Sequence, residues 1–515
     1  MQNLPIGIQN FEKLRNENLK YIDKTAILYY LVKSGCYYFL SRPRRFGKSL
    51  FLSTLEAYFQ GKKELFHGLA IEQLEKDWNE YPVLHLDLNT EKYQEPEALD
   101  TILHYHLDLW EKQSNIKATE ETLGLRFMQV IQLTYERTGK QVVILVDEYD
   151  KPILQAIDNP ALQDAYRNTL KSFYGALKSC DQYIKFAFLT GVTKLGKVSV
   201  FSDLNNLRDI SMEKDYHDIC GITQDELHSN FNDYISRLSE EHELSRDETY
   251  TRLKEQYDGY HFCEDKVEGV YNPFSLLNCF VKRKFGSYWF ETGTPSYLVE
   301  LLKKHNYNLA RLETEELSFD EINSIDSTST NPIPVIYQSG YLTIKDYDKR
   351  FELYKLGFPN KEVKEGFLKF LIPFYAPKHA EKSDFEISNF VLSLERGKIE
   401  DFMSRLQSFM ANCPYELQPE QERHFQTIMF LLTTLCGLYC EVESHTNKGR
   451  MDMTIKTDKY VYIFEFKFNA TAEAALQQIH DKGYVEPYRM DERKIVCIGV
   501  NYSSEARNID KWSIQ

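Results

Sequence analysis

At 515 residues, the chain is too long for one hydrophobic core and predicts roughly two to four domains. Its hydrophobic share of 42% and charged share of 27% are typical of ordered globular proteins and exclude disordered and fibrous ones. The net charge of -15 argues against a surface that coats nucleic acid non-specifically, so any contact with DNA or RNA must be local.

The N-terminal segment MQNLPIGIQNFEKLRNE is too polar for a secretory signal. No stretch reaches the unbroken apolar length of about 20 residues that a membrane span needs. The nine cysteines lack paired C-x-x-C spacing, which predicts reduced thiols. Cys436 and Cys440 lie one helical turn apart and are interpreted as buried helix residues, not zinc ligands. We therefore expect a cytoplasmic protein without a membrane partner.

The first chemical motif follows an apolar run, Cys36–Ser41, that predicts a buried strand. The loop RPRRFGKS comes next, and then a helix ending near Gly61, which is the order of a phosphate-binding loop. Helix N-terminal amides hold phosphate oxygens, Lys48 reaches the outer phosphates and Ser49 ligates magnesium. The alternative is a basic turn before an amphipathic helix. The candidate nucleotide contacts are Pro43, Arg44, Arg45, Phe46, Gly47, Lys48 and Ser49.

One position departs from the G-x-x-x-x-G-K-[ST] pattern. Arg42 stands where the first glycine is expected. We expect the backbone to turn there without the conformational freedom of glycine. ATP binding is therefore the firmer prediction, and hydrolysis the weaker one.

A second apolar run, Gln141–Val146, predicts a buried strand that ends in Asp147 and Glu148. In a Walker B strand, Asp147 would hold magnesium through water, and Glu148 would orient or deprotonate the attacking water. The alternative is a buried strand whose polar end merely meets solvent. Lys48 precedes Asp147 with helix and strand material between them, which favours the ATPase interpretation.

Two further strands are predicted at Val83–Leu88 and Tyr183–Leu189. Strands that alternate with helices predict an α/β fold with a parallel sheet. Thr190 would lie at the carboxyl end of its strand, where open α/β sheets bind ligands and where a γ-phosphate sensor belongs. A plain strand-ending threonine is an equally common alternative.

Together these motifs resemble the AAA-ATPase-like family of bacterial proteins across residues 1–215. The resemblance rests on LPIGIQNFEKLRNENLKYIDKT, RPRRFGKS, VDEYDKP, LTGVTKL and FSDLNNLRDIS. The family is similar to archaeal-type and STAND-related ATPases, whose loop often reads G-P-R-R-x-G-K-[ST]. It implies a bacterial source and ATP as ligand. Arg44, Arg45 or Arg208 could stabilise the transferred phosphate, and the sequence does not choose among them.

Residues 216–400 contain charged stretches that are predicted to be helical. Two turn-rich landmarks interrupt them, Tyr257–Phe262 and Tyr271–Leu277. A helix ending at Gly340, two strands around residues 346–349 and a new helix from Lys361 resemble a winged helix. Such a module can bind DNA or cover an ATPase, and its mixed charge favours packing. Residues 327–334 are interpreted as a linker or an exposed loop.

Near the C-terminus, residues 449–456 and 460–467 predict an antiparallel hairpin. A turn at residues 458–459 places Asp452 opposite Glu465 on one face, with Lys467 one alternation further along. Adjacent carboxylates repel one another, so a divalent cation, Mg²⁺ or Mn²⁺, is their natural partner. The metal would activate water for phosphodiester hydrolysis, and Lys467 would support the developing charge.

This region resembles the PD-(D/E)XK nuclease superfamily, in the subgroup fused to AAA-ATPase-like domains, across residues 415–505. Asp452 and Glu465-Phe466-Lys467 match the core motif. The resemblance implies that Glu422, in ERHFQTIMFLLTTL, joins the metal site, and that Gln478 or its neighbour Gln477 is the accessory polar residue. Taken singly, each could be an ordinary surface residue. The candidate metal ligands are Glu422, Asp452 and Glu465, with Lys467 and Gln478 completing the catalytic set.

The predicted organisation is an AAA-ATPase-like domain at 1–215, a helical and winged-helix-like region at 216–400 and a nuclease-like α/β domain at 401–515. The leading hypothesis is an ATP-dependent protein with a metal-dependent nuclease acting on DNA or RNA. One alternative is a nucleotide-switched interaction or signalling protein with an inactive nuclease fold. Another is a DNA-binding regulator. A homo-oligomer, the choice of nucleic acid and coupling between the two sites stay open.

Overall fold

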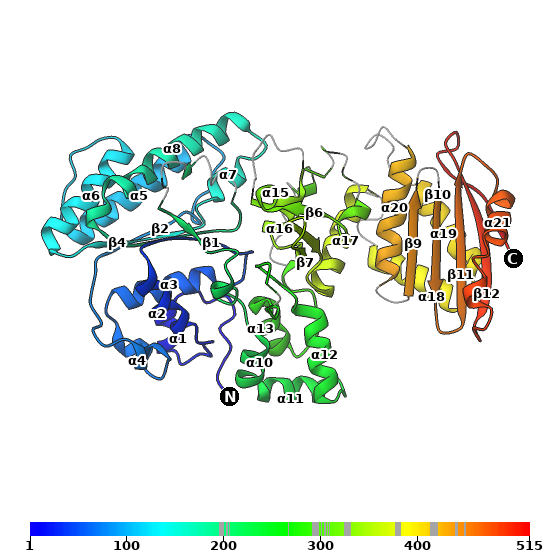
Figure 1. The fold of residues 1–515 in the computed structure, drawn as a ribbon, viewed down its shortest axis with the longest axis horizontal. Coiled ribbons are helices and arrows are strands. Elements are labelled where there is room, and N and C mark those ends of the chain that lie inside the picture. Colours follow the sequence, from blue (N-terminus) through cyan, green and yellow to red (C-terminus); the bar gives the residue numbers. More distant parts are fainter. Residues whose placement is uncertain are drawn as a thin grey trace. The chain divides into compact units, whose positions relative to one another are not determined.

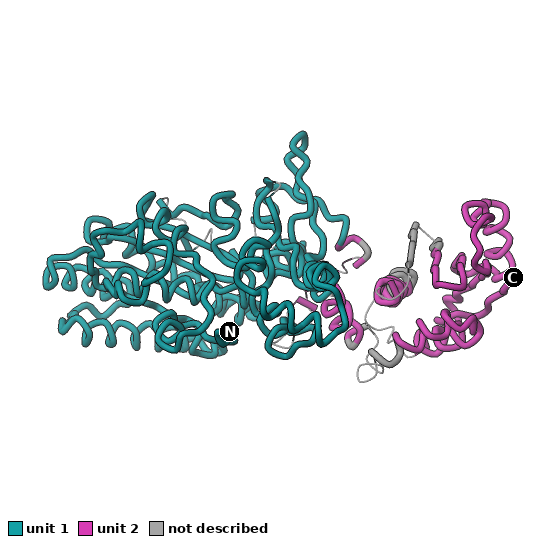
Figure 2. The backbone as a smooth tube through the Cα atoms, turned by 90° about the horizontal axis from the view of Figure 1, so that it is seen from below, with its two compact units in different colours: residues 1–293, 313–363 teal, residues 294–312, 364–515 magenta. Residues whose placement is uncertain are grey.

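A computed structural model describes most of the chain as two compact units. It describes residues 1–194, 200–201, 204, 206–265, 267–290, 298–299, 301–302, 305, 307, 309–323, 331–375, 383–411, 421–437, 441–447 and 450–515, with the backbone alone at 310, 373, 375, 383–386, 421–424, 426, 441–447 and 450–452. Unit 1 comprises Met1–Gly293 with Glu313–Val363, and unit 2 comprises Thr294–Leu312 with Lys364–Gln515 (Figure 2). The three-part division at residues 215 and 400 stays a prediction, and the first half of the predicted linker, at 327–330, lies outside the described residues.

Unit 1 is built on a parallel sheet, as the alternating strand and helix pattern predicts. Its strands have the order β2-β3-β4-β1-β5, and all neighbouring strands are parallel. They are β1 (Tyr37–Ser41), β2 (Val83–Asp87), β3 (Val142–Asp147), β4 (Ile184–Gly191) and β5 (Arg208–Asp209). β3 is buried along its whole length, which explains its unbroken apolar sequence. β4 lies between β1 and β3, so the carboxyl ends of these three strands meet at one edge.

Helices cover both faces of this sheet (Figure 1). One face carries α1 (Phe11–Asn16), α2 (Thr25–Ser34), α3 (Lys48–Phe59) and α4 (Ile71–Leu74); the other carries α5 (Glu97–Ser114), α6 (Leu123–Thr138), α7 (Lys151–Gln155) and α8 (Pro160–Ser179). The apolar stripes of α6 and α8 meet through Phe127 and Phe173, whose rings stack at 4.3 Å. This three-layer arrangement fixes β1, α3 and β3 as a rigid frame.

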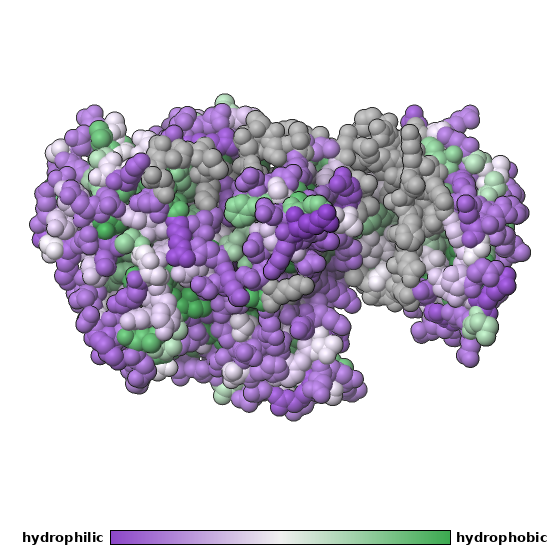
Figure 3. Space-filling model, viewed as in Figure 1, coloured by the Kyte–Doolittle hydropathy of each residue, from purple (hydrophilic) through white to green (hydrophobic). Residues whose placement is uncertain are grey.

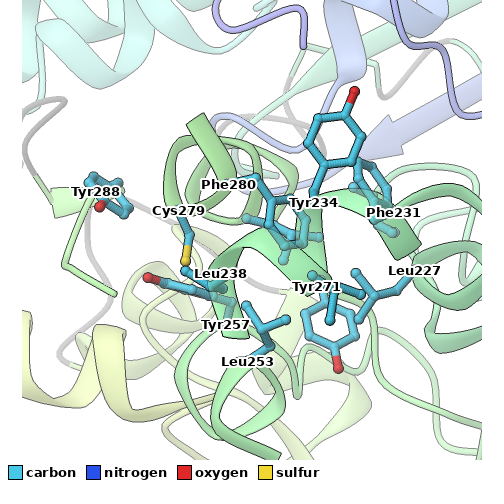
Figure 4. Packing of buried hydrophobic residues seen from close by; sticks show 13 residues of the cluster. Leu227, Phe231, Tyr234, Leu238, Leu253, Tyr257, Tyr271, Cys279, Phe280 and Tyr288 are labelled. Carbon is cyan, nitrogen blue, oxygen red and sulfur yellow. The ribbon is translucent and has the colours of Figure 1, made fainter. Parts of the chain in front are cut away.

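Four further helices of unit 1 pack around an aromatic cluster (Figure 4). They are α10 (Gln224–Asn230), α11 (Asn232–Glu241), α12 (Arg246–Tyr257) and α13 (Pro273–Lys282). Capping boxes at Thr223 and Ser245 begin α10 and α12. In the cluster, the rings of Phe231 and Phe280 stack at 5.2 Å. These helices therefore have a core of their own within unit 1.

A small antiparallel sheet follows, with the order β6-β8-β7. Its strands are β6 (Glu316–Ser318), β7 (Thr343–Asp348) and β8 (Leu353–Gly357). The helices of this part of the chain are α15 (Phe319–Asn323), α16 (Ile333–Gln338) and α17 (Lys361–Tyr375). The predicted helix end at Gly340, the hairpin and the new helix at Lys361 are confirmed. Because five of the six residues of α16 are buried, this helix packs into the unit and offers little surface for reading a DNA groove.

Unit 2 contains a five-stranded mixed sheet with the order β13-β12-β11-β10-β9. β11 and β12 are parallel, and the other neighbours are antiparallel. The elements are α18 (Ser383–Glu395), α19 (Ile399–Ala411), α20 (Gln421–Cys436), β9 (Glu441–Asn447), β10 (Arg450–Lys456), β11 (Tyr460–Phe468), α21 (Ala472–Asp481), β12 (Lys494–Ser503) and β13 (Asn508–Ile514). The predicted hairpin is β10–β11, and Asp452 pairs with Glu465 as expected.

The two faces of β11 meet different helices. Phe464 contacts Phe402 of α19 and Phe466 contacts Phe425 of α20, with ring centroids 5.7 and 5.8 Å apart. Val461 and Ile463 on the other face pack with Ile479 of α21. The face that carries Glu465 is therefore apolar at its start and polar only near its end, and α21 covers it.

No helix in the described part of the chain is both long and apolar enough to cross a membrane. In Figure 3 the visible face of unit 1 is mainly hydrophilic, with small, scattered apolar areas.

Candidate functional site

The loop between β1 and α3 places a lysine at the start of a helix. Gly47 takes a left-handed φ of 101° and caps the N-terminus of α3. Lys48 is 4% exposed. Its Nζ donates to the carbonyl of Arg42 at 3.0 Å and lies 3.6 Å from the Glu148 carboxylate. Ser49, the second residue of α3, is half-buried. The free amides of the helix N-terminus, the Lys48 ammonium and the Ser49 hydroxyl can together bind an anion.

Arg42 has a structural role that the sequence pattern did not reveal. Its side chain is 1% exposed and donates to the carbonyls of Ser211 at 2.7 Å and Tyr216 at 2.9 Å. The guanidinium also lies 4.1 Å from the centre of the Phe262 ring. The left-handed residues of the loop are Arg45, with φ 66°, and Gly47, not residue 42. The backbone at residue 42 therefore turns without the left-handed conformation that glycine would allow.

The rest of the loop packs against residues from the two turn-rich landmarks and their surroundings. The ring of Phe46 lies 4.7 Å from that of Tyr260. Trp289 Nε1 donates to the carbonyl of Arg44 at 3.1 Å, and the Arg44 guanidinium lies 5.0 Å from the Trp289 ring. The Arg45 guanidinium lies over the ring of Phe274 at 5.1 Å, and Pro43 is buried beside Gly340. Tyr260, Phe274, Trp289 and Gly340 thus support the shape of the loop.

At the edge of the sheet, Asp147 ends β3 and Thr190 lies near the end of β4. Thr190 is fully buried, and its Oγ1 donates to Asp147 Oδ1 at 2.7 Å. Asp147 is 6% exposed. This hydrogen bond orients the Asp147 carboxylate. The structure thus places Thr190 against the predicted magnesium ligand; its role as a phosphate sensor stays a prediction.

Glu148 lies between Asp147 and the lysine of the loop. Its φ is 54°, a left-handed conformation that is uncommon for a residue other than glycine. Burial raises the pKa of the Glu148 carboxyl to about 7; nearby Asp150 and Asp147 also raise this pKa, while Lys48 opposes the change. A carboxylate with a pKa near neutral pH can accept a proton from water and release it again.

Asp150 was not singled out from the sequence, although it lies in VDEYDKP. It is fully buried and accepts hydrogen bonds from Thr193 N at 2.6 Å, Thr193 Oγ1 at 2.7 Å and Val192 N at 3.2 Å. Burial raises the pKa of the Asp150 carboxyl. The signal that could have found it is a third acidic residue directly after a Walker B strand.

A mainly apolar cavity of about 100 Å³ adjoins the loop. Gly47 and Leu50 line it from the loop and α3, Tyr21 from the N-terminal segment, and Ile222 and Leu277 from the middle of unit 1. An apolar cavity beside a phosphate-binding loop suits a flat aromatic ring. The sequence did not predict this cavity, because its walls come from three distant segments.

A second cluster lies in unit 2, where β11 faces α21. Glu465 is fully buried, Lys467 Nζ lies 3.1 Å from its Oε1, and Gln478 Nε2 donates to the same oxygen at 2.6 Å. Lys467 Nζ also donates to Gln478 Oε1. Gln478 therefore connects the acid and the lysine, while Gln477 hydrogen-bonds to Asp481 instead. Of the two predicted amides, Gln478 is the one that lies in this cluster.

Gly499 of β12 lets α21 approach this cluster. It pairs with Glu465 across the sheet. A Cβ at this position would lie 2.2 Å from the Ala472 carbonyl and 2.4 Å from Leu476 N. Only glycine leaves room for the helix at this distance.

The other two predicted metal ligands are placed only by their backbones. Asp452 pairs with Glu465 in the β10–β11 ladder, and Glu422 lies in the first turn of α20. Their side chains lie outside the described residues, and α20 packs on the Phe466 face through Phe425. Among the side chains that are described, no group of three His, Cys, Asp or Glu residues is arranged to hold a metal. The Glu465–Lys467–Gln478 cluster is thus the described part of this site.

Comparison with known proteins covers both sites. A family model described as a predicted AAA-ATPase matches residues 5–201, and one described as PD-(D/E)XK nuclease superfamily matches residues 420–512. An uncharacterized protein in the vnfD 5′ region of Azotobacter chroococcum mcd 1 is 34% identical over 519 residues, covering 98% of this chain and 97% of that protein. The chain belongs to the AAA-ATPase-like family, in the form fused to a PD-(D/E)XK nuclease superfamily domain.

The AAA-ATPase-like match runs from the N-terminal segment to just beyond β4, so it contains the loop, Asp147, Glu148 and Thr190. The PD-(D/E)XK match runs from α20 into β13 and contains the whole second cluster. Residues 202–419 lie outside both family models. The aromatic residues that support the loop of the AAA-ATPase-like domain come from this unmatched stretch.

Proposed function

We propose that the protein binds and hydrolyses ATP in unit 1 and that its C-terminal domain cleaves phosphodiester bonds of DNA or RNA with a divalent metal. The observation that carries the first part is the meeting of Lys48, Glu148 and Asp147 at the carboxyl edge of the parallel sheet. The second part rests on the Glu465–Lys467–Gln478 cluster opposite Asp452.

In unit 1, the amides at the start of α3 and the Lys48 ammonium would bind the phosphates. The apolar cavity beside Gly47 would take the adenine ring. Ser49 and Asp147 would hold Mg²⁺, which neutralises phosphate charge when bound. Glu148, whose pKa is raised to about 7, would accept a proton from the water that attacks the γ-phosphate. Thr190 would keep Asp147 in position through its 2.7 Å hydrogen bond.

In unit 2, Asp452 and Glu465, joined by Glu422, would hold Mg²⁺ or Mn²⁺. Such a metal activates water and stabilises charge on the scissile phosphate. Glu465 is fully buried, and the Lys467 ammonium, 3.1 Å from its Oε1, already offsets part of its charge. Lys467 would stabilise the charge on the phosphate, and Gln478 would hold both Lys467 and Glu465 in place.

The nuclease proposal is tested by incubating the full chain with mixed single-stranded and double-stranded DNA and RNA, with Mg²⁺ or Mn²⁺, with and without ATP. Asp452→Ala and Lys467→Ala are expected to abolish cleavage. Lys459→Ala, at the exposed tip of the same hairpin, is the matched control and is expected to cleave normally. Cleavage that persists in both site variants would refute the assignment.

The ATPase proposal is tested with a fluorescent ATP analogue and a phosphate-release assay. Lys48→Ala is expected to abolish nucleotide binding, whereas Glu148→Gln keeps binding and loses hydrolysis. Lys63→Ala, an exposed lysine just beyond α3, is the control. If Lys48→Ala leaves cleavage unchanged with ATP present, the two sites are uncoupled. Nucleotide binding without any cleavage would instead favour the nucleotide-switched interaction protein with an inactive nuclease fold.

A further inference from the structure

The chain just after β3 is tied to the chain at the end of β4. Tyr149 N donates to the carbonyl of Thr190 at 3.0 Å, and Tyr149 Oη donates to the carbonyl of Thr193 at 3.2 Å. Asp150 accepts from Val192 N, Thr193 N and Thr193 Oγ1. Asp147 is held by Thr190 Oγ1. Residues on both sides of Glu148 are thus anchored to residues 190–193.

Glu148 itself has a strained backbone. A left-handed conformation is unfavourable for a residue with a Cβ, so the surroundings must impose it. The anchors at Asp147, Tyr149 and Asp150 supply that constraint. With φ at 54°, the Glu148 carboxylate points toward Lys48, whose Nζ lies 3.6 Å away.

An independent observation shows that residues 149–150 approach the end of β4 closely. A Cβ on Gly191 would lie 2.6 Å from Asp150 Oδ1 and 2.6 Å from two ring carbons of Tyr149. Gly191 is not among the left-handed glycines, so space alone requires a glycine here. The missing side chain lets Asp150 reach the amides of residues 192 and 193.

We propose that Asp150 is a positioning residue for ATP hydrolysis: by binding Val192 and Thr193, it holds Glu148 in the left-handed conformation that directs its carboxylate to the terminal phosphate. This inference rests on the proposed ATPase function. Asp150 acts through the backbone of Glu148 and does not itself contact nucleotide.

The chemistry of the three donors explains why a carboxylate is needed. Two of them, Thr193 N and Thr193 Oγ1, meet Oδ2, and Val192 N meets Oδ1. Asparagine keeps the shape of aspartate but can accept on one side only. Its NH₂ group would then face an N–H donor, which would push the two segments apart and release Glu148.

The test compares Asp150→Asn and Thr193→Val with the native full chain, using steady-state ATP hydrolysis and the affinity for a fluorescent ATP analogue. Asp150→Asn is expected to lower kcat at least about tenfold while analogue affinity and KM change less than about twofold. Thr193→Val removes one hydrogen bond to Asp150 and should lower kcat less. Thr249→Val is the matched control. It also removes a buried hydroxyl, which is hydrogen-bonded to Ser239 at 2.8 Å, but residue 249 is far in sequence from Asp150 and Thr193. Its kcat should be native.

Each result has one meaning. An unchanged kcat in Asp150→Asn overturns the positioning role, and so does a parallel loss of kcat and analogue affinity, which indicates general damage. If Asp150→Asn does not fold, Thr193→Val decides: a native kcat there overturns the role. A native chain that binds the analogue but hydrolyses no ATP refutes the proposed ATPase function itself, and the inference falls with it.

Discussion

Restoring the glycine of the family motif at residue 42 should damage this protein. Arg42→Gly removes a buried guanidinium that donates to Ser211 and Tyr216 and stacks on Phe262 at 4.1 Å. Two buried carbonyls lose their donor, at a cost of about 1–3 kcal/mol each. The lost ring contact costs about 2 kcal/mol more, while relief from burying the charge offsets part of the total. We expect unfolding free energy to fall by about 3–5 kcal/mol.

Urea unfolding of the full chain, followed by tryptophan fluorescence and circular dichroism, measures this loss. Arg350→Gly, at the exposed tip of the β7–β8 hairpin, is the matched control and should change stability by less than about 1 kcal/mol. Because Arg42 also shapes the phosphate-binding loop, the affinity for an ATP analogue should fall as well. An Arg42→Gly protein with native stability and equal or tighter nucleotide binding would refute this reasoning.

Two further predictions concern unit 2 and the first face of unit 1. Gly499→Ala should push α21 away from β12 and break the hydrogen bond between Gln478 and Glu465, which should lower nuclease activity at least about tenfold. Gly175→Ala is the control and should keep native activity, because a Cβ there has open space around it. Cleavage of nucleic acid, followed on gels, measures both effects. Burial raises the pKa of Glu75, but hydrogen bonds from Tyr58, Asp77 N and Lys33 outweigh it and lower this pKa from 4.5 to about 2. The lowered pKa stabilises the fold above pH 4.5, and this contribution is lost as the pH falls toward 2. The difference in urea stability between the native and Glu75→Gln proteins should therefore narrow below about pH 5.

The parts that the sequence predicts well are those set by short-range pattern. The alternation along residues 450–467 fixed the hairpin register, so Asp452 was placed opposite Glu465 from the sequence alone. The apolar run before Asp147 likewise gave a fully buried strand. In both cases the side-chain period of two along a strand is a local property.

The features that the sequence did not predict depend on contacts between segments that are distant along the chain. The Arg42 guanidinium donates hydrogen bonds to the carbonyls of Ser211 and Tyr216, and no local sequence pattern predicts these partners. α21 covers Glu465, and its close approach depends on Gly499, 21 residues beyond Gln478 in the sequence. Asp150 was not predicted because its partners, residues 192–193, lie just after the end of β4, far from it in the sequence.

The same long-range packing predicts that a residue far outside the family motif governs nucleotide binding. Gly340 has a φ of 90°, and a Cβ there would lie 2.5 Å from Pro43 Cβ of the phosphate-binding loop. Gly340→Ala should therefore displace the loop and weaken binding of a fluorescent ATP analogue by about tenfold, or about 1.4 kcal/mol. Gly68→Ala is the matched control: its φ of 78° brings the same backbone strain, but its Cβ would meet nothing within 4 Å. If both variants lose stability and only Gly340→Ala loses affinity, collision with Pro43 is the cause. Equal affinity in the two would show that the loop keeps its shape without close packing against Gly340.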